Sequence, residues 1–189
     1  MDYCKNAEEL RNVLEASKAL SPAADAVGRE IVSVLRGGGK ILTCGNGGSA
    51  ADALHMSEEF VGRFSRERRS LPAVCLCADP TLLTCILNDY GADKVFSRQV
   101  ESLGRDGDLL FGFTTSGNSR NIVEAFAAAK KRGVKTVLVS GKGGGRLKGA
   151  ADFELIVPSS STARIQEVHT LLLHSWLEAV DEAFAGSGE

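Results

Sequence analysis

Short apolar runs alternate with amphipathic segments along most of this chain. The runs are rich in leucine or β-branched residues and are bounded by Gly, Pro, Asp or Ser, which predicts strands. We expect strands at Lys40–Cys44, Ala73–Ala78, Asp108–Thr115, Lys135–Ser140 and Phe153–Pro158. The apolar spacing between and after them predicts helices near residues 49–63, 81–88, 93–104, 119–132 and 162–184. Continuous apolar strands separated by helices are typical of a parallel sheet covered on both faces.

A helical extension is predicted before the first strand, over residues 6–35. We expect Ser21-Pro22 to break it in two, with Ser21 as N-cap and Pro22 as the first helical residue. The predicted fold is therefore α/β: an open five-stranded parallel sheet with helices on both faces plus an N-terminal helical extension. It forms a single domain, in which residues 1–36 are the extension and residues 37–184 the α/β core.

Composition and charge narrow the class of protein. The chain has 189 residues, of which 43% are hydrophobic and 24% charged, as in soluble globular proteins. A net charge of −2 indicates neither a nucleic-acid partner nor a membrane surface. The five cysteines, an odd number without a C-x-x-C pair, indicate free thiols in a reducing cytoplasm. The basic segment at residues 63–69 is predicted to be a solvated loop.

Two loops after predicted strands share one pattern, in which Gly-Asn is followed by Ser and then by a helix. They are residues 45–49 and residues 114–119, and the second holds four hydroxyl side chains. Hydroxyls and free N–H groups at a helix start favour an anion, so we predict a phosphate site at residues 114–119. The alternative is that Ser49 and Ser119 only cap their helices.

Two glycine-rich stretches suggest other ligands less strongly. Residues 45–50 contain G-x-G-x-x-A, but the next candidate acid, Asp79, lies about 30 residues further on, beyond the spacing of about 20 in dinucleotide-binding folds. Residues 141–145 resemble a P-loop only in composition, so we expect a flexible connection there.

Ionisable residues on two predicted helices are candidates for chemistry. His55 and Glu59 share a helix face, whereas Glu58 is expected to point elsewhere. The His55–Glu59 pair could bind a metal, move protons or be a simple surface pair. His174 lies in an apolar stretch, which also suits a core histidine. Gln166 and His174 are about 12 Å apart along their helix, so both reach one ion only if the glutamine leans over or a neighbouring subunit contributes.

Four segments carry a family resemblance: CGNGGSAADALHMSEEFVGRF, ILNDYG, TTSGNSRNIVEA and ARIQEVHTLLLHSW. Over about residues 5–184 they resemble the sugar isomerase (SIS) domain family, and within it most closely the sedoheptulose 7-phosphate isomerases, also called phosphoheptose isomerases. The resemblance implies a cytoplasmic homotetramer that converts sedoheptulose 7-phosphate into D-glycero-D-manno-heptose 7-phosphate. This reaction is the first step toward ADP-heptose for the lipopolysaccharide core.

The resemblance also implies roles for individual residues. It implies a zinc site at His55, Glu59, Gln166 and His174, with Glu59 and His174 as the acid–base pair. It implies substrate contacts from Asn46, Gly47, Gly48, Ser49, Glu59, Asn88, Asp89, Thr114, Thr115, Ser116, Ser119 and Gln166. From the residues alone, Asn88 and Asp89 suit capping and binding equally. Aldose–ketose isomerisation moves a proton between two carbons through an enediol, which suits a carboxylate base, a second proton shuttle and a polarising metal ion.

The sequence departs from the family pattern at two positions, and two competing functions remain. Thr114-Thr115 stands where close relatives often have Ser-Thr, and Ala163 stands where some have an acidic residue, which leaves fine substrate positioning open. A non-catalytic SIS-domain binding protein of the DnaA initiator-associating type shares this fold. Because that relative is understood to lack the equivalents of Glu59 and His174, their presence here favours the enzyme. A sugar-phosphate-sensing regulator is disfavoured because no DNA-binding module is attached.

Overall fold

A five-stranded parallel sheet forms the centre of the fold in the computed structural model, which describes residues 2–186. Its strand order is β2-β1-β3-β4-β5, and every neighbouring pair is parallel. The strands are β1 (Ile41–Gly45), β2 (Ala73–Cys75), β3 (Leu109–Thr114), β4 (Lys135–Ser140) and β5 (Phe153–Ile156). The predicted fold class is confirmed; residues 1 and 187–189 of the predicted single domain lie outside the described residues.

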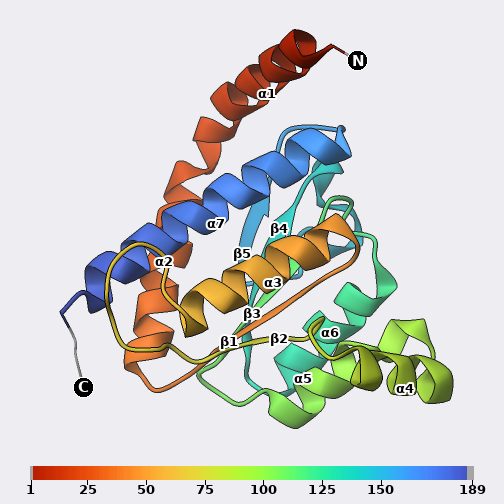
Figure 1. The fold of residues 1–189 in the computed structure, drawn as a ribbon. Coiled ribbons are helices and arrows are strands. Elements are labelled where there is room, and N and C mark those ends of the chain that lie inside the picture. The colour runs from red at the N-terminus through yellow and green to blue at the C-terminus, as the bar shows by residue number, and fades with distance from the viewer. Residues whose placement is uncertain (1, 187–189) are drawn as a thin grey trace.

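Helices cover both faces of the sheet, as Figure 1 shows. One layer consists of α2 (Ser21–Arg36), α3 (Gly48–Val61) and α7 (Thr162–Phe184), and the other of α5 (Ser97–Leu103) and α6 (Arg120–Lys131). Successive strand residues point to opposite faces, so that Ile41 packs in the first layer's core and Leu42 in the second's. Because the central strands β1 and β3 are buried along their whole length, their sequences are almost continuously apolar rather than alternating.

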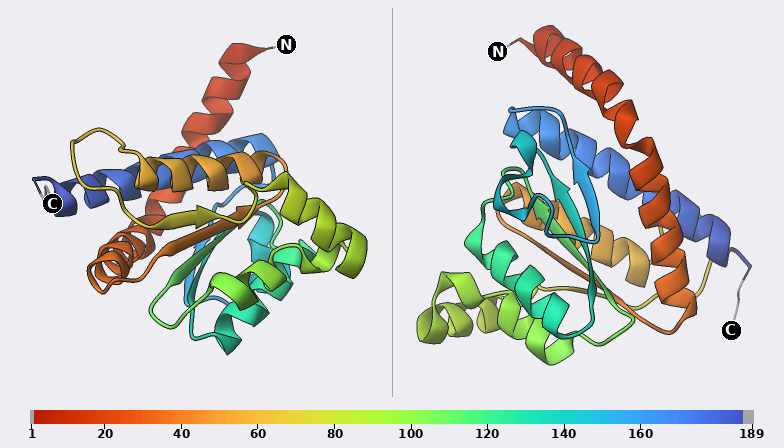
Figure 2. Two further views of the ribbon diagram at one scale, coloured as in Figure 1. Left: turned by 60° about the horizontal axis from the view of Figure 1, so that its bottom comes forward. Right: turned by 180° about the vertical axis from the view of Figure 1, so that it is seen from behind.

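The N-terminal extension is α1 (Tyr3–Ser17), a 3₁₀ turn η1 (Lys18–Leu20) and α2. The helix is interrupted near Ser21 as predicted, but Ser21 does not cap α2, because Leu20 occupies that position and Ser21 is itself helical, with φ −50°. Within the described chain α1 has no buried residue, and Figures 1 and 2 show it projecting past the end of α7. It is tied to α7 where the guanidinium of Arg164 donates to the Asn6 carbonyl over 2.8 Å.

Two other element boundaries differ from the prediction. The helix expected over residues 93–104 is divided into the 3₁₀ turn η2 (Ala92–Lys94) and α5. The strand expected over residues 73–78 ends at Cys75, and the chain then turns into α4 (Pro80–Tyr90). Asp79 starts that helix, because its carboxylate accepts from the N–H groups of Thr81 and Leu82. This carboxylate is therefore an N-cap, which removes the candidate ribose ligand of a dinucleotide site.

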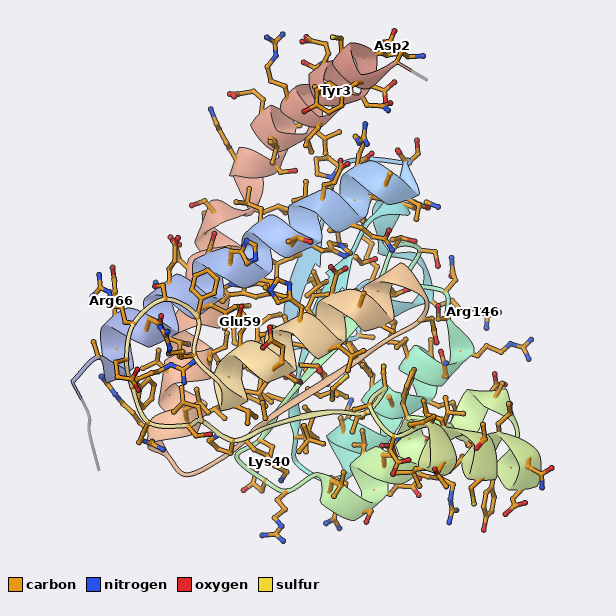
Figure 3. All side chains as sticks on the ribbon, in the orientation of Figure 1. Asp2, Tyr3, Lys40, Glu59, Arg66 and Arg146 are labelled. Atoms are coloured by element: carbon orange, nitrogen blue, oxygen red, sulfur yellow. The ribbon has the colours of Figure 1, made fainter. Side chains whose placement is uncertain are left out.

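The prediction of a solvated basic loop is wrong for Arg68. Its side chain is fully buried, and its Nε lies 2.9 Å from Oδ1 of Asp181 on α7. The rest of its guanidinium donates to carbonyls at the end of α3, including those of Glu59 and Phe60. A charge count along the sequence cannot distinguish this arginine from its exposed neighbours, such as Arg66 (labelled in Figure 3).

Within residues 2–186 no helix combines the length and the apolarity needed to cross a bilayer.

Candidate functional site

The ends of β1 and β3 meet at the topological switch point of the sheet. β1 and β3 are neighbours, but the chain continues from β1 to one edge and from β3 to the other. Gly45 pairs in register with Phe113, which places the loop after β1 beside the turn after β3. Open parallel sheets bind their ligands at this position, beyond the carboxyl ends of the strands.

A polar cavity of about 250 Å³ lies between these two loops. Its lining residues are Asn46, Gly48, Ser49, Phe113, Thr114, Thr115, Ser116, Ser119, Thr162 and Gln166. Three helices begin at its wall, since α3 starts at Gly48, α6 directly after Ser119 and α7 at Thr162. Each helix N-terminus contributes a partial positive charge and unpaired N–H groups, so their convergence favours an anion.

The serine hydroxyls of this cavity are not used as helix caps. Ser49 lies inside α3, whose N-cap is Gly47. Ser119 does occupy the N-cap of α6, but its side chain makes no capping hydrogen bond to the described residues, and its Oγ lies 3.4 Å from Oγ1 of Thr114. The interpretation of these serines as caps only is therefore wrong, and their hydroxyls are available to a ligand.

The glycine-rich stretch after β4 supports the turn at residues 114–119, called the hydroxyl turn from here on. The residues expected to be a flexible connection form η3 (Lys142–Leu147), in which Gly144 and Leu147 are buried. The N–H of Leu147 donates to the Gly117 carbonyl over 3.2 Å. Gly117 has φ +63°, and a Cβ there would overlap the carbonyl oxygen of Gly144. The stretch is therefore a packed support for residues 114–119, which its composition alone does not indicate.

Asn121 also belongs to this region, although no sequence pattern predicts a role for it. Its side-chain amide exchanges two hydrogen bonds with that of Asn46, at 3.0 and 2.9 Å. The pair ties the loop after β1 to the first turn of α6. The only signal in the sequence is its position two residues after Ser119.

The ionisable candidates lie further along α3. Nε2 of His55 is 3.5 Å from Oε1 of Glu59, and the rings of His55 and His174 meet edge to face with centroids 5.2 Å apart. Figure 3 shows Glu59 on the side of α3 that looks toward α7. Glu58 was expected to point elsewhere, but it offers a carboxylate oxygen within 4.8 Å of ligand atoms of both His55 and Glu59. His174 is half-buried and stacks on Phe64, so it is not a core histidine.

The seam between α3 and α7 joins the polar cavity to this cluster. At the cavity end, a Cβ on Gly48 would lie 2.5 Å from the side-chain nitrogen of Gln166. In the middle, the Thr170 hydroxyl donates to Oδ1 of Asp52 over 3.2 Å. Burial raises the pKa of the Asp52 carboxyl, although the Thr170 hydrogen bond and the nearby His55 oppose the change. Six residues of α3, about 9 Å of helix, separate Ser49 from His55.

Three predicted site residues lie apart from the His55–Glu59–His174 group. The amide of Gln166 packs against Gly48, about 10 Å of helix before His55. Asn88 and Asp89 lie exposed on α4 and are not among the described residues that line the polar cavity. Their side chains bond to each other, with Nδ2 of Asn88 2.7 Å from Oδ1 of Asp89. Within one chain, these two residues therefore do not meet the other candidates.

Comparison with known proteins defines the class first: the SIS domain family model matches residues 2–141. Individual relatives narrow the class to one group of enzymes. The phosphoheptose isomerase of Campylobacter concisus is 48% identical over 94% of this chain and 97% of its own, and that of Nitratiruptor is 52% identical over 81% and 82%. A solved phosphoheptose isomerase from Neisseria gonorrhoeae has a TM-score of 0.89 at 41% identity, covering 94% of this chain and 96% of its own. The chain belongs to the phosphoheptose isomerase family of SIS domain proteins, and it is an isomerase.

Proposed function

We propose that this chain is a sugar-phosphate isomerase that converts sedoheptulose 7-phosphate into D-glycero-D-manno-heptose 7-phosphate, the first step toward ADP-heptose for the lipopolysaccharide core. The family of the chain supports the substrate, because its relatives are named phosphoheptose isomerases. The observation that carries the proposal is that two sites lie along the interface between α3 and α7. A cavity suited to an anion lies at one end and a His–Glu–His cluster at the other.

The cavity would hold the phosphate. Three helix N-termini and the hydroxyls of Ser49, Ser116 and Ser119 surround it, and all of them favour an anion. Thr114 and Thr115 complete the turn, so the replacement of a serine by Thr114 keeps the hydroxyl. An anchored phosphate places the other end of the sugar along α3, toward His55 and Glu59, and restricts its motion before the reaction.

Glu59 and His174 would move the protons. The Glu59 carboxylate removes a proton from C1 of the ketose, which gives an enediol, and returns it to C2. His174 carries a proton from the O1 hydroxyl to O2, so that the C2 carbonyl becomes a hydroxyl and C1 becomes the aldehyde. Glu59 is largely buried and within 3.5 Å of His55, which holds it in place. Arg68 fixes the backbone beneath it by donating to the Glu59 carbonyl over 2.6 Å.

A zinc ion fits the donor atoms of the cluster. Imidazole nitrogens and carboxylate oxygens are common zinc ligands, and His55, Glu58 and Glu59 offer such atoms within 4.8 Å of one another. His55, Glu59, Gln166 and His174 would hold the ion, and the Gln166 amide would have to turn from Gly48 toward His55. When bound, zinc supplies Lewis-acid polarisation of the substrate oxygens.

We also propose that the protein is a cytoplasmic homotetramer. The support is exposed apolar surface: Tyr3 on α1 is 81% exposed, and Leu87 and Tyr90 on α4 are more than half exposed. In a tetramer, Asn88 and Asp89 would contribute to the site of a neighbouring subunit. Sedimentation of the purified protein tests the assembly, and a monomer at micromolar concentration would contradict it.

A direct assay tests the function. The purified protein is incubated with sedoheptulose 7-phosphate, and heptose 7-phosphate is followed with and without a chelator. We expect turnover that chelation abolishes and zinc restores. Absence of turnover by the zinc-loaded protein would contradict the isomerase and favour the non-catalytic binding protein, and turnover that survives complete metal removal would contradict the zinc.

Two substitutions test the acid–base pair. Glu59→Gln and His174→Gln should each lower kcat by at least about a hundredfold, the usual contribution of a general acid or base. Glu178→Gln, an exposed change one turn beyond His174, is the matched control and should behave as the parent chain. Rates close to those of the parent for either variant would refute the assignment.

A further inference from the structure

Lys142 is the one non-glycine residue with a positive φ among residues 2–186. Its φ is +51°, at the point where the chain leaves β4 and enters η3. A lysine in this conformation is disfavoured by its Cβ, and such outliers persist where the surroundings or the function require them.

The side chain of Lys142 reaches the rim of the polar cavity. Its Nζ donates to the hydroxyl of Thr162 over 2.8 Å, and its backbone N–H donates to the Ser159 carbonyl over 3.0 Å. Thr162 is the first residue of α7 and belongs to the lining of the cavity. Only the Thr162 hydroxyl therefore lies between the ammonium group and the polar cavity.

The cavity otherwise lacks a cation. None of the described residues that line it is a lysine or an arginine. The nearest arginine on α7 is Arg164, whose guanidinium is occupied by the Asn6 carbonyl and by the carboxylates of Glu9 and Glu167. Lys142 forms no ion pair within residues 2–186, so its charge is free to meet an incoming anion.

We propose that Lys142 is a substrate-binding residue whose ammonium group contacts the phosphate that occupies the polar cavity. The inference rests on the proposed function and adds to it the one full positive charge of the subsite. A lysine ammonium is a compact charge that suits a phosphate oxygen, and a charge-assisted hydrogen bond is stronger than one from a hydroxyl. The left-handed backbone at Lys142 turns the side chain toward α7 instead of along the direction of β4.

Steady-state kinetics of Lys142→Met and Lys142→Arg test the inference, with Lys148→Met as the control. Lys148 is also exposed and lies just after η3. We expect Lys142→Met to raise KM for the sugar phosphate about tenfold with kcat within about twofold, because a contact equal in ground and transition states is lost. The inhibition constant for inorganic phosphate should rise in parallel, Lys142→Arg should restore most of the binding, and Lys148→Met should match the parent.

A second variant separates charge from backbone strain. Lys142→Gly keeps the left-handed turn without the charge, so it should behave like Lys142→Met. KM and phosphate inhibition within about twofold of the parent in Lys142→Met, or a defect in Lys142→Met that Lys142→Gly lacks, would overturn the inference. If the parent chain itself showed no turnover, the proposed function would fail, and calorimetry with inorganic phosphate on the same variants would still decide the role of Lys142.

Discussion

The stability of this protein should depend on pH through His169, which lies on α7 with its ring 6.1 Å from that of Phe113, a residue of the cavity wall. Its side chain is fully buried, and its Nε2 lies 3.2 Å from the Ser140 carbonyl oxygen. Because a carbonyl only accepts, the neutral ring must carry its proton on Nε2. Nδ1 is then buried without a partner among the described residues. A second proton on the ring would have nowhere to donate.

The size of the effect follows from the pKa. Burial lowers the pKa of His169 from 6.5 to about 4, although the hydrogen bond to Ser140 works in the opposite direction. Between these two values the unfolded chain binds a proton that the folded chain does not, so stability falls as the pH falls. Relative to pH 7, the free energy of unfolding should drop by about 2 kcal/mol at pH 5 and about 3 kcal/mol at pH 4.

Denaturant unfolding of the parent chain and of His169→Gln at several pH values tests this expectation. The glutamine amide can donate to Ser140 but does not titrate, so the variant should lose about 2 kcal/mol of pH dependence between pH 7 and pH 5. Other groups, including Asp52, affect both chains alike and cancel in the difference. Protein concentration must be fixed, since assembly also contributes to stability. Equal pH dependence in the two chains would refute the reasoning.

Two further predictions concern packing. Arg68→Met should lower the free energy of unfolding by about 3 kcal/mol in denaturant unfolding, because the buried Asp181 loses its counter-charge but keeps N–H donors from Ser65 and Arg66. Arg66→Met is the control, and equal losses in the two variants would contradict the argument. Gly117→Ala should destabilise the chain and raise KM, whereas Gly143→Ala, with φ +78° but nothing within 4 Å of its Cβ, should cost only about 1–2 kcal/mol. Equal effects of the two alanines would show that the contact with residue 144 is unimportant.

The sheet and its covering helices could be predicted because their signals are local. Each strand is mostly apolar, and the predicted bounds of β4 and α7 agree with the structure. Boundaries were missed where the local backbone conformation decides them. β2 ends at Cys75 because the chain turns there, with the Ala78 N–H donating to the Cys75 carbonyl, and Ser21 fails as a cap because the backbone stays helical through Leu20.

The candidate site was predictable in its chemistry and not in its arrangement. Residue type and spacing identified the hydroxyl turn and the His55–Glu59 pair. No pattern along the chain shows that Arg68 is buried, that Glu58 joins the cluster, or that residues 142–147 pack on Gly117. The sequence also suited His174 to a core position, and only packing shows that His169 is the buried histidine of α7 and His174 the half-buried one.

Gln166 and His174 lie about 12 Å apart along α7. In the structure α7 runs beside α3, so positions on the two helices pair in steps: Gly48 with Gln166, Asp52 with Thr170, and His55 with His174. Each step advances both helices by three or four residues, about one turn. A substrate that is a phosphate at one end and a carbonyl at the other needs two sites at a fixed separation. Two packed helices keep that separation because neither can slide without breaking every pair along the seam. Under the proposed function, the rigidity of the α3–α7 pair fixes the distance between the polar cavity and the His55–Glu59–His174 group.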